Sequence, residues 1–297
     1  MNIFINCLRK DFLELKREKR QILFFIIVFL LGAFVLSITL LLPLLLNTLI
    51  EKNSSILEYK KIFDMINTLF PDDLKGSLKI FSSDVGVFYS IIVIFISSGL
   101  LPSEIKSGKW LLPLSCGYKP TILLTSKVII NSLFAGLPCF VLYMLYYFIG
   151  SQFLKCNFAV ESAVLNAFAL AFSIYAIVSI SVLSSAIIKN KIITIISLIT
   201  VVIGVPDVLS LFSFGKYLPT HLLTFAYNST ENSLELIVPV VFTIIVVLSM
   251  YMIALKSVKK LHLDRSNEKK GGCKNEENYC DDFGNSFIIF LRVAYWL

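Results

Sequence analysis

The sequence predicts an all-α integral membrane protein with six transmembrane helices and both termini in the cytoplasm. Hydrophobic residues make up 57% of the 297 residues, and the mean hydropathy is +0.81. Charged residues make up only 16%, whereas a soluble domain carries about 25%. The apolar residues are gathered in runs close to the ~20 residues that a helix needs to cross a bilayer. These observations exclude an ordinary soluble domain.

The apolar runs give the six predicted spans. The second run is short, and the fifth contains Gly204, Pro206 and Asp207, so that it is a candidate for a broken helix. The predicted spans are 22–46, 85–101, 128–153, 162–188, 192–212 and 236–255.

The distribution of basic residues orients these spans. Alternate segments between the runs hold 20 and 7 of the 27 lysines and arginines. Because basic residues collect on the cytoplasmic side of membrane proteins, the richer set is predicted to be cytoplasmic. It comprises the N-terminus, the loop 103–127, the turn 189–191 and the tail 256–297. The loop 51–84 is then external, and the formal charge of +7 needs no nucleic-acid partner.

Residues 1–20 predict an amphipathic helix in the cytosolic membrane interface. Apolar residues recur at spacings of three and four, at Ile5, Leu8, Phe12 and Leu15, and basic residues occupy much of the remainder. A merely charged flank to the first span is the alternative. The predicted domains are therefore this helix, a transmembrane domain over 21–255, and a tail over 256–297 that is largely disordered.

The sequence offers no catalytic, cofactor or metal site. Its six cysteines form no CxxC pair, and there are only two histidines. The two Gly-Lys pairs lack the remaining residues of a phosphate-binding loop, so this chain is not expected to bind ATP. No pair of carboxylates is seen to converge. A membrane-embedded enzyme is accordingly disfavoured, because such enzymes place charged catalytic groups within their spans.

The segment Ser103 to Pro120, "SEIKSGKWLLPLSCGYKP", is too polar to cross a bilayer and too apolar for a solvated loop. Its tryptophan and leucines, rimmed by lysines, suit a docking surface for another protein, since such anchors dominate interface energies. Glycines and a proline are expected to bend the backbone at defined points. A plain juxtamembrane connector, with its leucines in the interface, is the alternative. The predicted docking residues are Glu104, Gly108, Trp110, Leu111, Leu112, Leu114 and Lys119.

The stretch 104–127 resembles the first cytoplasmic loop of the membrane subunits of type-2 ABC exporters. That loop often has a Glu, a Gly four residues on, a leucine-rich turn, a Pro-small-basic turn, and a Lys at the start of the third span. Here Glu104, Gly108 and Lys127 match, whereas Gly117 stands where a proline is usual and Lys109 where a threonine often follows the glycine. Lys127 is expected to reach anionic headgroups.

The resemblance implies a permease that works with a separate ATPase subunit and a second permease chain, as a homodimer or heterodimer, in a bacterial cell membrane. ATP would bind to the partner, and the loop 103–127 would be the coupling element, with Leu8, Phe12 and Leu15 on the interfacial helix beside it. The cargo would be an amphipathic peptide, drug or lipid-like molecule.

The resemblance also favours a re-entrant outer gate over 204–228, around Pro206, Asp207 and Pro219, against a plain external loop. The alternative function for the whole chain is an accessory or scaffold protein, or a channel, without ATP coupling.

Overall fold

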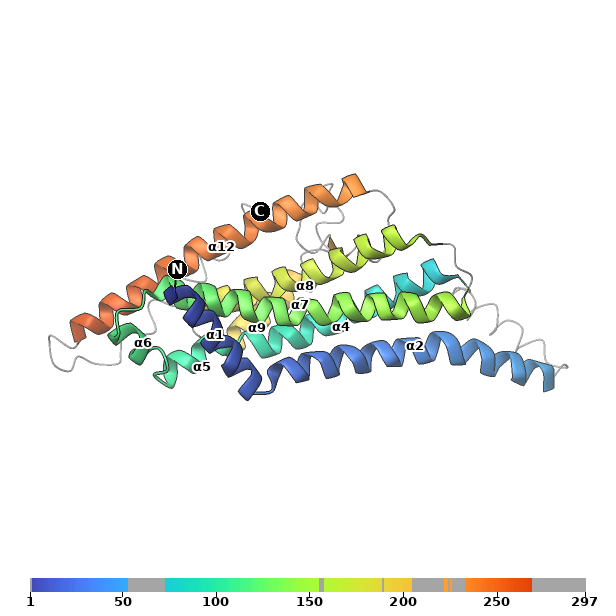
Figure 1. Ribbon diagram of the computed structural model, residues 1–297, viewed down its shortest axis with the longest axis horizontal. Helices are drawn as coiled ribbons and strands as arrows, with labels where there is room; N and C mark the ends of the chain where they lie inside the picture. Colours follow the sequence, from blue (N-terminus) through green and yellow to red (C-terminus); the bar gives the residue numbers. More distant parts are fainter. Residues whose placement is uncertain are drawn as a thin grey trace.

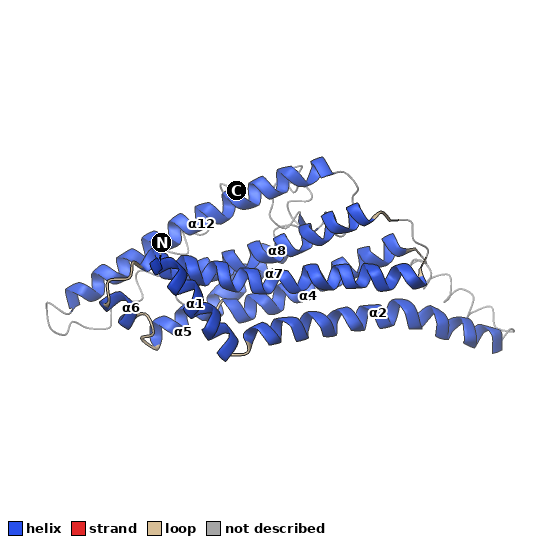
Figure 2. Ribbon diagram, in the orientation of Figure 1, coloured by secondary structure: helices blue, strands red, loops and turns tan. Residues whose placement is uncertain are grey.

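The chain folds into a bundle of long helices with shorter helices at one end (Figure 1). The structure is a computed structural model that describes residues 2–52, 73–154, 158–188, 190–204, 222–223, 225 and 233–268. The described residues are almost entirely helical and contain no strand element (Figure 2). The helices are α1 (Asn2–Arg17), α2 (Arg20–Lys52), α4 (Leu74–Ser97), α5 (Leu100–Lys106), α6 (Leu111–Ser115), α7 (Pro120–Phe153), α8 (Val160–Ile188), α9 (Lys191–Ile199) and α12 (Ser233–Glu268), with one π-helical turn, η1 (Thr200–Gly204).

Within the described residues, five helical segments are long and apolar enough to cross a membrane. The all-helical prediction is thus confirmed for the described residues, whereas the predicted number of six spans is not, because the described part of the fifth predicted span, 192–212, contains no helix of spanning length. Where the fifth span was predicted, a shorter apolar helix covers Lys191–Val202, and regular α-helix gives way to the π-helical turn η1 after Ile199. The five segments are Arg20–Ile38, Leu74–Lys106, Pro120–Phe153, Val160–Ile188 and Leu236–Val258.

Several helix boundaries differ from those expected. Helix α7 begins at Pro120 rather than at residue 128, so its first turns lie in the segment that was assigned to the cytoplasmic loop. Helix α4 begins at Leu74 rather than at residue 85, so its first turns lie in the segment that was assigned to the external loop. These turns are polar on one side, which lowers their average hydropathy, yet Leu74, Leu78 and Phe81 are fully buried at helical spacing. Helix α12 continues to Glu268, into the predicted tail. The remainder of that tail lies outside the described residues.

Helix α8 lies at the centre of the bundle and packs against α4, α5, α7, α9 and α12. Its sequence is rich in alanine and serine, which allow neighbouring helices to approach closely. Helix α7 approaches α8 closely at Gly136, where an added Cβ would lie 2.8 Å from the carbonyl oxygen of Ala171. The apolar packing between α7 and α8 therefore requires glycine at this position.

Hydroxyl groups link the three inner helices. The Tyr89 hydroxyl of α4 donates to the carbonyl oxygen of Ala135 on α7 at 3.0 Å, and the hydroxyls of Ser132 on α7 and Ser179 on α8 lie 2.9 Å apart. Such bonds satisfy polar groups that neither lipid nor the apolar core could satisfy. The inner helices are thereby fixed in both rotation and register.

Replacing Gly136 with alanine should lower the apparent thermal midpoint of the purified protein in detergent, with a cost of about 1–3 kcal/mol for overpacking. The new Cβ would meet backbone, which can move only if a helix moves. Gly32→Ala is the matched control, because its Cβ would meet only the flexible side chain of Leu142. Equal midpoints for the two variants would contradict the packing argument.

Candidate functional site: a buried charge cluster at the loop end of the bundle

The first cytoplasmic loop expected from the sequence folds into α5, α6 and the turn between them. Each short helix ends at a glycine in the left-handed region, Gly108 with φ 70° and Gly117 with φ 81°. The residue after each glycine donates its backbone N–H to a carbonyl oxygen of the preceding helix. Lys109 donates to the backbone carbonyl of Glu104 at 3.1 Å, and Tyr118 donates to that of Pro113 at 3.0 Å. This is the Schellman arrangement, which only glycine adopts without strain. The expectation that these glycines turn the backbone is confirmed.

Helix α1 lies across the same end of the bundle and packs against α7 and α2 (Figure 1). Cys7, Asp11 and Leu15, four residues apart, form its buried face, and Leu15 is 1% exposed. Of the other predicted interfacial residues, Leu8 is half-buried and Phe12 is exposed, with its ring centroid 5.6 Å from that of Phe134. An aspartate therefore sits in the middle of the face that the helix buries.

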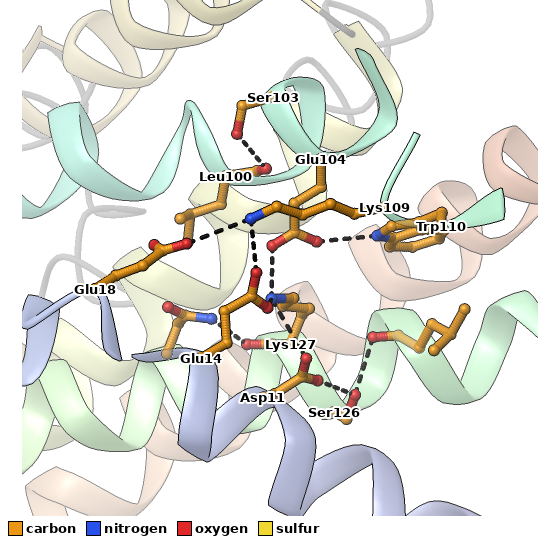
Figure 3. Close-up of polar contacts among 12 residues, drawn as sticks. Asp11, Glu14, Glu18, Leu100, Ser103, Glu104, Lys109, Trp110, Ser126 and Lys127 are labelled. Atoms are coloured by element: carbon orange, nitrogen blue, oxygen red, sulfur yellow. Dashed lines mark hydrogen bonds and ion pairs between the residues drawn. The ribbon is translucent and has the colours of Figure 1, made fainter. Parts of the chain in front are cut away.

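That aspartate belongs to a buried cluster centred on Lys127 of α7 (Figure 3). The Lys127 Nζ lies 2.5 Å from Glu104 Oε1, 2.6 Å from Glu14 Oε2 and 3.3 Å from Asp11 Oδ1. Lys127 and Glu104 are 3% exposed and Asp11 is 4% exposed. We call these four residues the Lys127 cluster. It joins α1, α5 and α7 through one ammonium group.

Every carboxylate oxygen of the Lys127 cluster has a partner. The second oxygen of Asp11 accepts from the hydroxyl of Ser126, and that of Glu104 accepts from the Trp110 indole N–H at 2.9 Å. The second oxygen of Glu14 accepts from Lys109 Nζ at 2.8 Å. The ammonium of lysine has three donors, and three carboxylates face it, so the cluster is saturated. Saturation is what makes burial of four charges tolerable.

A more exposed layer of ion pairs continues the cluster outward. Lys109 Nζ lies 3.4 Å from Glu18 Oε1, and Glu18 Oε2 lies 2.5 Å from the Arg20 guanidinium at the start of α2. Burial opposes the ionisation of Glu14, but hydrogen bonds and charge from Lys109 and Lys127 outweigh it and lower the pKa of Glu14 to about 2. The hydrogen bond to Glu14 in turn raises the pKa of Lys109.

The structure corrects the expectation for Lys127 and the view that no carboxylates converge. Lys127 was expected to reach headgroups, but it points into the protein and is held by three carboxylates. Sequence reasoning missed Asp11 and Glu14 as site residues. One signal was available: Asp11, Glu14 and Glu18 recur at helical spacing on an otherwise basic helix, as expected for a face that meets a lysine.

Some of the predicted docking residues are buried in the protein and others are exposed on its surface. Trp110 is 5% exposed and, with Glu104, turns inward, so it is not an anchor on the outer surface. Leu114 is half-buried against the apolar core, whereas Lys119 is exposed at the start of α7. The side chains of Leu111 and Leu112 lie outside the described part of the structure, as do Pro206, Asp207 and Pro219.

The cluster fits an architectural role better than a catalytic one. Its carboxylates are engaged by cations, and no group of three or more His, Cys, Asp or Glu suited to a metal ion occurs in the described ranges. The fold, with five apolar helices of spanning length, indicates a membrane protein. No protein-family model, curated protein or solved structure matches the chain.

Replacing Lys127 with methionine should destabilise the protein by about 3–5 kcal/mol, because the buried Asp11 and Glu104 and the partly buried Glu14 lose their shared cation. The expected result is a lower apparent thermal midpoint in detergent and faster tryptic cleavage within α1. Lys106→Met is the control, since Lys106 is exposed beside the same loop. A midpoint for Lys127→Met like that of the control would show that the cluster contributes little.

The depressed pKa of Glu14 predicts a defined pH window. Its folded-state pKa is about 2, against an ordinary value of 4.5. Its stabilising contribution should therefore be complete above pH 4.5 and lost as the pH falls towards 2. The measurement is the difference in thermal midpoint between the native protein and Glu14→Gln from pH 7 to pH 2. That difference should be constant down to about pH 5 and then shrink. A difference that does not change with pH would contradict the assignment.

Proposed function

We propose that this chain is the membrane-spanning permease subunit of an ATP-driven exporter and that a separate ATPase subunit docks beside α5 and α6. A second permease chain, identical or different, would complete the transporter in a bacterial cell membrane. The cargo would be an amphipathic peptide, drug or lipid-like molecule. In this proposal six spans place both termini and the docking loop on the cytoplasmic side.

The observation that carries the proposal is the rigid attachment of a short loop unit to the long helices. Glu104 of α5 is bonded both to Trp110 and to Lys127 of α7, and Lys109 in the turn is bonded to Glu14 of α1. A displacement of the α5–α6 unit would therefore move α1 and α7 with it, because the charges cannot separate without exposing a buried ion. Such stiffness suits a unit that passes motion from an ATPase to the spans.

The inward orientation of Trp110 changes which residues would meet the ATPase. The exposed side chains of this unit include Lys106, Ser115, Cys116 and Lys119. These side chains are polar and two of them are lysines, which suits an acidic groove on the partner. In this proposal Trp110 and Glu104 position the docking unit from within and do not touch the partner.

The proposal is tested by purifying the tagged chain from its native host in mild detergent and assaying for a co-purifying ATPase. The double variant Lys106→Glu/Lys119→Glu should retain roughly tenfold less ATPase, because reversed charges would repel an acidic groove. Lys79→Glu is the control, as Lys79 is exposed near the N-terminal end of α4, whereas α5 follows the C-terminal end of that helix. Absence of any ATPase from the native sample would overturn the exporter proposal and favour a scaffold or channel. ATPase retained equally by all the variants would overturn only the docking face.

A further inference from the structure

The charges of α1 are segregated around its axis. Its acids, Asp11, Glu14 and Glu18, point towards Lys127 and Lys109. Its basic residues within the helix lie on the other side, and all four are exposed. At 3.6 residues per turn they fall within an arc of about 120° that contains no acid. In the described part of the chain, none of these four forms an ion pair with a carboxylate. They are Arg9, Lys10, Lys16 and Arg17.

Apolar side chains share this outward face. Ile5, Phe12 and Leu13 are 49%, 38% and 53% exposed. Around the helix, Leu13 lies between Arg9 and Arg17, and Ile5 and Phe12 lie beside Lys16. A face in contact with water alone would gain nothing from these side chains. Basic residues interleaved with large apolar ones are typical of a helix in the headgroup region, where the apolar groups enter the acyl boundary and the cations stay at the phosphates.

The surroundings of α1 continue the same surface. Phe12 lies beside Phe134 of α7, and the neighbouring Leu133 and Leu137 of that helix are 45% and 44% exposed. The first turns of α2 expose Leu23 and further apolar residues. Helix α1 therefore lies where the apolar flank of two spanning helices gives way to the charged end of the bundle (Figure 1).

We propose that this outward face of α1 is a binding site selective for anionic phospholipid headgroups. Arg9 and Lys16 form one row, two turns apart, and Lys10 and Arg17 form a second, so that the phosphates of neighbouring lipids can lie along both. A lipid is favoured over an acidic protein because the face is continuous with the exposed apolar flank of α7. Each basic residue near an anionic surface favours binding by about fivefold. The proposal does not depend on the exporter proposal.

The test uses the full chain in phosphatidylcholine vesicles with a trace of spin-labelled lipid. Electron paramagnetic resonance then gives the association constant of phosphatidylglycerol relative to that of phosphatidylcholine at the protein surface. The native protein should prefer phosphatidylglycerol at low ionic strength and lose most of the preference at about 1 M salt, where the Debye length is about 3 Å. The variant Arg9→Gln/Lys10→Gln/Lys16→Gln/Arg17→Gln should lose at least threefold of that preference. The control Lys106→Gln/Lys119→Gln, at the same end of the bundle, should keep it.

Equal association of the two lipids with the native protein would overturn the proposal, as would a preference that survives neutralisation of the four residues. If an acidic protein co-purifies through these residues while lipid selectivity is absent, the face is a protein interface and the proposal fails. If the fourfold variant does not fold, the proposal is tested by the salt dependence of the lipid preference in the native protein. It is also tested by the preference of the charge-conserving variant Arg9→Lys/Arg17→Lys. That conservative variant should retain the preference, and its loss would count against binding through charge.

Discussion

The arrangement of this protein depends on one buried ammonium group shared by three carboxylates. Lys127 lies in α7, and its partners come from α1 and α5, so three elements are positioned by one set of ion pairs. The free energy of burying such charges is acceptable only when every partner is present at short distance. Helices α1, α5 and α7 therefore hold their relative positions only while all three carboxylates contact Lys127.

This interaction also explains the form of the loop between α4 and α7. The glycine-terminated end of α5 turns the chain at Gly108, and this turn brings Trp110 back onto Glu104. The indole N–H thus satisfies a carboxylate oxygen that would otherwise be buried without a partner. A loop that would be mobile if it were merely polar becomes a rigid unit of the bundle. The same ion pairs draw the acids of α1 inward and leave its basic face turned outward.

Much of the fold could be predicted from the sequence because spanning helices are specified by local composition. Runs of apolar residues gave the long helices, and the bounds of α8 are close to those expected, whereas α7 begins at Pro120 and not at the expected residue 128. The start of α4 was missed because an average over a window cannot separate the buried side of Leu74 and Leu78 from the polar side of the same turns. The predicted fifth span, and therefore the predicted number of six spans, was not confirmed within the described residues. In the candidate site, Glu104 and the two glycines were identified, but the direction in which Trp110 points was not.

By itself the sequence determined that this chain is helical and strongly apolar, and that glycines turn it within 103–127. It also determined that basic residues are concentrated in alternate segments between the apolar runs. These properties depend on residue type and on short-range spacing, which can be read along the chain. Only the tertiary structure decided that Asp11, Glu14 and Glu104 share Lys127. The Glu14–Lys127 bond joins residues 113 positions apart, and the Ser126–Asp11 bond joins residues 115 apart. No local pattern encodes such a pairing, because it arises only when α1 folds back across α7.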